Sequence, residues 1–193
     1  MTKPGTQADE LRVLPLDPAD AAAVERAAAL LVEGFREHHP RAWPDMDAAR
    51  EELRECLNLE WIALGAFGAD GVLVGWIGGQ PQYHGEIWEL HPMVVDQRFR
   101  RRGIARMLVR ELERRVRERG VFTLYLGTDD ENEQTTLGGV ELFPGVLDRL
   151  RALRNLRDHP FEVYQRLGFE VVGILPDANG FGKPDIYMAK SLR

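Results

Sequence analysis

The sequence predicts a single α/β domain in which helices flank one mixed central β-sheet. Apolar runs with β-branched and aromatic residues, typical of strands, alternate with amphipathic segments typical of helices. A helix expected over residues 103–119 separates two strands, which predicts a parallel pair. An Asp-Gly pair at 70–71 predicts an antiparallel hairpin, so the sheet should contain both directions. At 193 residues the chain has the length of one domain.

The first half of the chain is expected to alternate between strands and helices. Its elements are a short strand over 11–16, helices over 19–34 and 45–57, and strands over 61–67, 72–77 and 86–95. The first helix is rich in alanine, which favours helices, and a glycine marks its end. The strands on either side of residues 68–71 should pair as the hairpin.

The second half is expected to begin with the helix over 103–119, whose apolar residues recur on one face. A strand over 121–126 follows, and then an insert loop over 128–158 that holds one short helix near 146–153. A last helix over 160–167 should begin at Pro160 and end before Gly168. Strands over 169–175 and 186–189 complete the sheet.

Composition excludes several kinds of partner. The net charge of −6 is unfavourable for nucleic-acid binding, which needs a surplus of Lys and Arg on the binding face. A single cysteine, Cys56, leaves a metal site without a thiolate pair, and no apolar run approaches the roughly 18 residues of a membrane span. The first ten residues lack the order of a signal peptide. We therefore expect a cytoplasmic protein without metal, nucleic-acid or membrane partners, with residues 1–9 flexible.

The sharpest motif lies between the expected strand over 86–95 and the helix that follows it. Its residues are Arg100, Arg101, Arg102, Gly103, Ile104 and Ala105. Small residues let a ligand approach the backbone, and the first N–H groups of a helix lie at the positive end of its dipole, so the motif predicts an anion cradle. The alternatives are an exposed basic helix end or a nucleic-acid patch, and the acidic total charge disfavours the second.

The Arg-x-x-Gly-x-Ala pattern after a strand resembles the acetyl-CoA signature of the GNAT superfamily of N-acetyltransferases. The resemblance implies the GNAT fold, with a splayed parallel strand pair, and acetyl-CoA as the cosubstrate. It implies that residues 100–105 hold the pyrophosphate and that backbone groups of Met93, Val94 and Val95 hold the pantetheine arm. Pro92 cannot donate to a strand ladder, so we expect a bulge near Pro92 and Met93.

Tyr164, followed by Gly168 and Phe169, resembles the Tyr-x-x-x-Gly-Phe signature of GNAT enzymes. The resemblance implies that Tyr164 contacts the cofactor and is the general acid that protonates the leaving thiolate. The alternative is a purely structural tyrosine. Asn155 lies slightly too far upstream to match the asparagine that often precedes this helix in the family.

The general base is left open among several groups. Glu89 lies eleven residues before Arg100, and this spacing resembles that of the general-base glutamate in some GNAT enzymes. Glu89 is therefore a candidate base that accepts the proton of the attacking amine. His91, which shares its strand face, an aspartate at 129–130, and water are the alternatives. A carboxylate paired with an arginine or exposed at the strand end is the structural alternative for Glu89.

Four carboxylates crowd residues 129–133, just beyond a central strand. Such a cluster favours a polycationic ligand, although most charge runs are solvated surface. The segments 127–132, 159–169 and 176–190 resemble the tail of aminoglycoside 6'-N-acetyltransferases. That resemblance implies that Asp129, Asp130 and Asp185 face the amines of the acceptor sugar.

The expected function is acetyl transfer from acetyl-CoA to an amine of a cationic small molecule, foremost an aminoglycoside. This activity is that of an antibiotic-resistance enzyme, and a homodimer is compatible with it. One alternative is a GNAT enzyme that acetylates a polyamine, a protein N-terminus or a lysine. Another is a noncatalytic acyl-CoA sensor, against which the intact Tyr164 argues.

Overall fold

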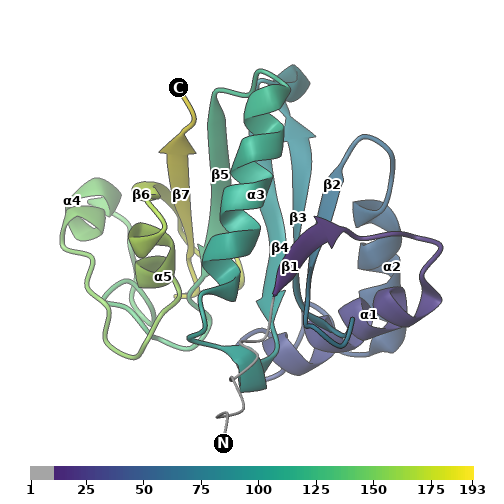
Figure 1. Cartoon of the computed structure of the whole chain (residues 1–193). Coiled ribbons are helices and arrows are strands. Elements are labelled where there is room, and N and C mark those ends of the chain that lie inside the picture. Colours follow the sequence, from purple (N-terminus) through teal and green to yellow (C-terminus); the bar gives the residue numbers. More distant parts are fainter. Residues whose placement is uncertain (1–10) are drawn as a thin grey trace, which may run out of the picture. The chain divides into compact units, whose positions relative to one another are not determined.

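The computed structural model describes residues 11–193 (Figure 1), so the expected flexibility of residues 1–9 lies outside the described residues. The order of the elements confirms the one predicted from the sequence. The strands are β1 (Arg12–Pro15), β2 (Ile62–Phe67), β3 (Leu73–Gln82), β4 (Ile87–Val95), β5 (Thr123–Asp129), β6 (Glu170–Leu175) and β7 (Asp185–Ser191). The α-helices are α1 (Ala21–Phe35), α2 (Met46–Cys56), α3 (Ile104–Glu118), α4 (Val146–Arg151) and α5 (Phe161–Arg166). Two short 3-10 turns, η1 (Tyr83–Gly85) and η2 (Gln97–Phe99), flank β4.

The strands follow the hydrogen-bonded order β1-β2-β3-β4-β5-β7-β6, which makes a mixed seven-stranded sheet. The β4–β5 pair is parallel, whereas β1–β2, β2–β3, β5–β7 and β6–β7 are antiparallel. The predicted mixed sheet with one parallel pair is therefore confirmed. The parallel ladder joins only residues 87–89 to residues 123–125, although both strands continue beyond it.

The chain divides into two compact units. The first holds residues 11–80 and 91–115, and the second holds residues 81–90 and 116–193. Strand β4 and helix α3 each run from one unit into the other. The prediction of a single domain over the whole chain stays a prediction.

The core of the first unit is built where α1 and α2 meet the sheet. Ala27 and Ala28 of α1 are fully buried, so the helix approaches closely enough for the Trp76 indole to donate to the Ala27 carbonyl at 3.1 Å. Asp20 and Asp45 cap the two helices by accepting hydrogen bonds from N–H groups of their first turns. Capping and burial therefore agree on where each helix begins, close to the predicted positions.

Helix α3 confirms the amphipathic pattern expected over residues 103–119. Its residues Ile104, Leu108 and Leu112 in the first unit are buried, and its arginines are on the other faces. Within residues 11–193 no helix is both long and apolar enough to cross a membrane.

Strand β4 carries Pro92, near which we expected a bulge, and that expectation stays a prediction. Burial alternates residue by residue from Ile87 to Val95. The His91–Pro92 peptide bond is cis. On β3, a Cβ atom at Gly78 would collide with the His91 carbonyl oxygen. The missing side chain at Gly78 thus gives β4 the room to pass close to β3 at its proline.

In the second unit one face of the sheet is apolar and covered. Leu124 and Leu126 of β5 and Ile186 and Met188 of β7 are buried on this face. Helix α4 contacts β6, and α5 contacts β7 (Figure 1). The opposite face of the same strands is polar and bears the residues described below.

The segment predicted as an insert loop over 128–158 is tied to itself by backbone contacts. Thr135 and Asn155 form an isolated antiparallel bridge. The Thr136 N–H donates to the Arg154 carbonyl at 3.0 Å, and the Gln134 carbonyl accepts from Leu156 at 2.8 Å. The long connection is therefore a closed loop with α4 at its far end.

Candidate active site

The residues predicted from the sequence fall into both units of the chain. The first unit holds His91, residues 93–95 and residues 100–105, whereas the second holds Glu89, Asp129, Asp130, Tyr164 and Asp185.

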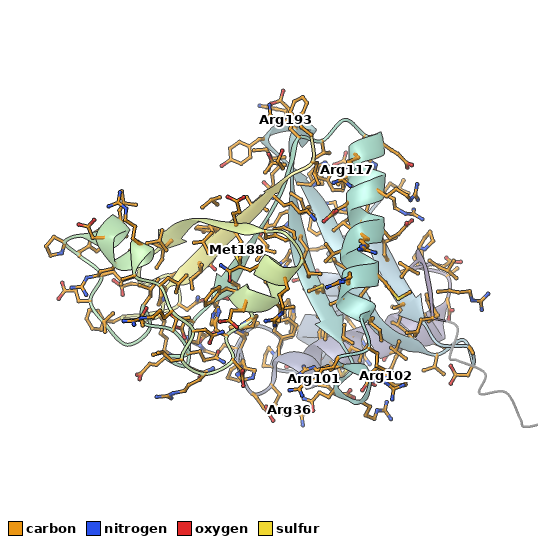
Figure 2. All side chains as sticks on the ribbon, turned by 60° about the vertical axis from the view of Figure 1, so that its left-hand side comes forward. Arg36, Arg101, Arg102, Arg117, Met188 and Arg193 are labelled. Carbon is orange, nitrogen blue, oxygen red and sulfur yellow. The ribbon has the colours of Figure 1, made fainter. Side chains whose placement is uncertain are left out.

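The predicted pyrophosphate turn forms an exposed corner before α3. Arg101 and Gly103 have left-handed backbone angles, with φ of 63° and 83°, so the chain turns sharply before the helix begins at Ile104. Figure 2 shows Arg101 and Arg102 at the N-terminal end of α3. A Cβ atom at Gly103 would meet no other atom within 4 Å. Positive side chains and the positive end of the helix dipole therefore meet at an open backbone, as an anion site requires.

Asp96 holds this turn in place and was not singled out from the sequence. Its buried carboxylate accepts hydrogen bonds from the Arg98 backbone N–H at 2.9 Å and from the Arg98 guanidinium at 2.7 Å. Arg26 of α1 donates to it at 2.6 Å. The hydrogen bonds from Arg98 lower the pKa of Asp96 to about 2. Arg98 is thus bound within the turn. The sequence signal for the role of Asp96 was an aspartate two residues before an arginine at the start of a turn.

The Val94 side chain near the end of β4 lies in the core. Val94 is buried in the core beside α1, where its Cγ2 atom would be 2.6 Å from a Cβ at Gly34. Only its backbone groups are left to serve a cofactor, as the prediction for residues 93–95 requires. A cavity of about 350 Å³ lies where α1 ends beside Val95, and Arg36 and Gln97 help to line it.

His91, an alternative base, contacts a carboxylate that the sequence did not point to. Its Nε2 atom lies 3.4 Å from Oε1 of Glu52 on α2. Burial raises the pKa of Glu52, but His91 together with hydrogen bonds from Trp43 and Cys56 outweighs burial and holds the pKa below its ordinary value. The Trp43 indole donates to the same carboxylate at 3.3 Å, so Glu52 orients His91 within the first unit.

The polar sheet face of the second unit brings together residues from three strands. The ladders place Glu89 opposite Tyr125, Gly127 opposite Tyr187, and Asp129 opposite Asp185. Because side chains two residues apart share a face, these positions lie on one surface. A Cβ atom at Gly127 would lie 2.5 Å from Oδ2 of Asp185, so this glycine gives the carboxylate its space. We call this surface, with Glu89, Tyr125, Gly127, Asp129, Asp185 and Tyr187, the acidic face.

Charges on the acidic face influence one another. The Tyr125 hydroxyl donates to Glu89 at 3.0 Å, and burial together with Glu89 raises the pKa of Tyr125 well above its ordinary value. Burial, then Asp129 and Glu89, raise the pKa of Asp185 to about 6. Within residues 11–193, Oδ1 of Asp185 is a buried side-chain atom without a hydrogen-bond partner. A cation placed here would relieve both the repulsion and the unmet hydrogen bond.

Asp129 and Asp130 are adjacent but lie in different surroundings. Asp130 is fully buried, and its carboxylate accepts hydrogen bonds from the N–H groups of Gln134 and Thr135 at 2.7 and 2.8 Å. The Thr135 hydroxyl donates to it at 2.7 Å. Asp130 therefore holds the loop that follows β5. Asp129, whose Oδ1 accepts from Asn179 at 2.5 Å, remains with Asp185 as a candidate acceptor ligand.

Tyr164 lies on α5 with its ring edge-on to Phe169, at 5.9 Å between centroids. Burial raises the pKa of Tyr164 to about 12, so the phenol stays protonated near neutral pH, as a general acid must. Asn155 binds the backbone of His159 through both ends of its amide, at 2.9 and 3.0 Å. Asn155 therefore ties the end of the loop to His159.

Comparison with known proteins agrees with this geometry. The model of the Acetyltransferase (GNAT) family matches residues 25–136, more than half of the chain. An aminoglycoside 6'-N-acetyltransferase solved with coenzyme A shares 40% identity and a TM-score of 0.85, over 94% of this chain and 97% of the other. The aminoglycoside 6'-N-acetyltransferase from Enterococcus faecium shares 40% identity and a TM-score of 0.83 over the same fractions.

An aminoglycoside 6'-acetyltransferase of type Ii shares 35% identity and a TM-score of 0.72, again over 94% of this chain and 97% of the other. No curated protein sequence matched the chain. The family match and these structures confirm the resemblance seen in the Arg-x-x-Gly-x-Ala and Tyr-x-x-x-Gly-Phe motifs. The chain belongs to the GNAT family of acetyltransferases.

Proposed function

We propose that this enzyme transfers the acetyl group of acetyl-CoA to an amine of an aminoglycoside, at the 6' position. The observation that carries the proposal is the acidic face, where Glu89, Asp129 and Asp185 repel one another and Asp185 has an unmet buried oxygen. Aminoglycosides carry several ammonium groups, and such a polycation neutralises a cluster of carboxylates. The similar proteins named above add support, since each bears the name of an aminoglycoside acetyltransferase.

The proposed reaction is a direct transfer. The neutral amine attacks the thioester carbonyl carbon, a C–N bond forms, and the C–S bond breaks. A base takes the proton that the amine loses, and an acid gives a proton to the leaving thiolate. We assign the acid to Tyr164, whose phenol is protonated at neutral pH. We assign the base to Glu89, which lies on the acidic face, with His91, an aspartate at 129–130 and water as the alternatives.

The proposed cofactor site is the turn before α3 together with the end of β4. Arg100, Arg101, Arg102 and the backbone of Gly103, Ile104 and Ala105 would hold the pyrophosphate. Backbone groups of Met93, Val94 and Val95 would hold the pantetheine arm. The exposed positive corner at Gly103 and the buried Val94 side chain support these assignments.

The test is acetyl-CoA consumption with a matched pair of aminoglycosides that differ only in a 6'-amine or a 6'-hydroxyl. Turnover of the amine with none of the hydroxyl analogue is expected. A rival is a GNAT enzyme for another amine, so polyamines and peptides with a free N-terminus or lysine complete the panel. Turnover of a polyamine or peptide without any aminoglycoside would replace the proposed acceptor. Binding of acetyl-CoA without turnover of any amine would favour the noncatalytic sensor.

The wider setting is also part of the proposal. An aminoglycoside acetyltransferase would protect its host from the antibiotic, and it would act in the cytoplasm, in keeping with a single, buried, unpaired cysteine. Expression in a susceptible bacterium tests the protection, with Tyr164→Phe as the inactive control. Light scattering of the purified chain tests for a homodimer.

A further inference from the structure

A buried histidine in the second unit, His159, contacts both the acidic face and the start of the helix that carries Tyr164. The imidazole is 1% exposed. Its Nε2 atom lies 3.0 Å from the backbone oxygen of Asp129, the last residue of β5. Its Nδ1 atom lies 3.2 Å from the backbone nitrogen of Phe161, the first residue of α5. Neither contact is used in the proposed chemistry.

These two contacts assign the proton on the ring. The Phe161 N–H is a donor, so Nδ1 must offer a lone pair and carries no proton. The Asp129 carbonyl is an acceptor, so Nε2 must carry the proton and donate it. The geometry thus requires the neutral imidazole with its proton on Nε2. A second proton, on Nδ1, would place one N–H donor against another, that of Phe161.

The carbonyl that His159 binds belongs to the peptide group between the two aspartates. The N–H of the same peptide group, which is that of Asp130, donates to the Pro184 carbonyl at 2.9 Å. The peptide plane is therefore held from both sides. This fixes Asp129 toward the acidic face and its neighbour toward the loop, where Asp130 accepts hydrogen bonds from Gln134 and Thr135.

The other side of His159 leads to Tyr164. The Asn155 amide fixes the His159 backbone through hydrogen bonds at 2.9 and 3.0 Å. The ring then accepts from the first N–H of α5, and the next turn of this short helix bears Tyr164. A six-residue helix gains little stability by itself, so its direction depends on such anchors.

We propose that His159 is a positioning residue that sets both the acceptor carboxylate Asp129 and the general acid Tyr164. The inference rests on the proposed function, because it assigns Asp129 to the acceptor and Tyr164 to the thiolate. Its Nε2–H bond serves acceptor binding, and its Nδ1 bond serves the proton transfer. The two contacts should therefore affect different kinetic constants.

Two substitutions separate the contacts. In His159→Asn the amide oxygen lies as far from Cβ as Nδ1 does in histidine. This variant therefore keeps the hydrogen bond from Phe161 and loses the one to Asp129. In His159→Gln the amide nitrogen lies as far from Cβ as Nε2 does in histidine. This variant therefore keeps the hydrogen bond to Asp129 and loses the one from Phe161. Steady-state kinetics with saturating acetyl-CoA and a 6'-amino aminoglycoside give both constants.

His159→Asn should raise the acceptor KM by about tenfold with kcat nearly unchanged, since the Asp129 carbonyl loses the donor that holds Asp129 toward the acidic face. His159→Gln should lower kcat by about the same factor and leave KM nearly unchanged. The matched control is His84→Asn in the exposed η1 turn, which should change neither constant. Equal changes in both constants, or no change in either, would reduce His159 to a core residue and overturn the inference.

Nitrogen NMR of the histidine rings in the wild-type enzyme tests the tautomer without any reaction. A neutral His159 with its proton on Nε2 at pH 7 is expected, and a proton on Nδ1 would overturn the inference even if both variants failed to fold. A wild-type enzyme that acetylates no aminoglycoside would refute the proposed function instead. An active enzyme without the split between KM and kcat would refute only the role of His159.

Discussion

Asp129 and Asp185 stand opposite each other at the end of the β5–β7 ladder, where Asp129 adds to the effect of burial and raises the pKa of Asp185 to about 6. Two carboxylates at such close range favour the proton on one of them. A bound ammonium group would reverse this preference. Protonation of Asp185 should therefore depend on whether an acceptor is bound.

Acceptor capture should weaken in mild acid. Above pH 6 the ionised Asp185 attracts an ammonium group, and as the pH falls through about 6 it gains a proton and the attraction is lost. The kcat/KM for a polycationic acceptor should fall through this range, because it reports groups of the free enzyme. Asp185→Asn should lower kcat/KM at pH 7 and remove this fall. An acid limb identical in variant and parent would exclude Asp185 as its source.

The raised pKa of Asp185 should also affect folding stability, which should fall with rising pH where acceptor capture rises. The folded pKa of Asp185, about 6, lies above its ordinary value of 3.8, so its contribution is present below pH 3.8 and is lost as the pH rises through 6. Asp185→Asn should thus be more stable than the parent at pH 7, and the gain should shrink toward pH 4. Denaturant unfolding at both pH values measures this. Asp148→Asn, at an exposed carboxylate, is the control.

The neighbouring aspartates should separate into a binding and a structural residue. Asp129→Asn should raise the acceptor KM about tenfold or more, since a charged hydrogen bond contributes about 1.5–3 kcal/mol. Added salt should raise the wild-type KM as well, because partly exposed charges are screened. Thermal unfolding of Asp129→Asn should stay near that of the parent.

Asp130→Asn should instead lower the melting temperature by about 4 °C or more, because a buried N–H group of the loop is left without its acceptor. A stable Asp130→Asn variant with a raised KM would return this residue to the acceptor site.

A negative charge placed at the turn before α3 should weaken coenzyme A binding. Gly103→Asp places a carboxylate where the pyrophosphate is proposed to bind, and it should weaken binding severely. Gly103→Asn has nearly the same bulk and tolerates the left-handed backbone, so it is the matched control. Calorimetry with coenzyme A gives both affinities. Equal affinity of Gly103→Asp and the parent would remove this turn from the cofactor site.

Turnover should depend on the hydroxyl of Tyr164. Tyr164→Phe should lower kcat by roughly 10²-fold or more, the range of general acid catalysis, and leave the affinity for acetyl-CoA unchanged. The ring keeps its packing on Phe169, so the fold should not suffer. Unchanged turnover would mean that water protonates the thiolate or that transfer is not limiting.

The elements that could be predicted from the sequence are those whose signals are local. The apolar stripe of α3, the Asp-Gly hairpin and the glycine that follows α5 each depend on residues within one turn or one strand. The turn proposed to bind the cofactor belongs with them, because Arg100 and Gly103 lie in one short segment. Strand β3 was predicted too short, since Gly78 and Pro81 weaken its local signal, and pairing with β2 supports it as far as Gly79.

The surroundings that distinguish the acidic residues depend on tertiary contacts. Asp129 and Asp130 have the same chemistry and adjacent positions, and no local pattern tells them apart. The two aspartates differ because His159 and Pro184 hold the peptide group that joins Asp129 to Asp130. These two residues lie about thirty and fifty residues further along the chain. Burial and pKa depend on such distant neighbours, because desolvation and charge act through space and not along the chain.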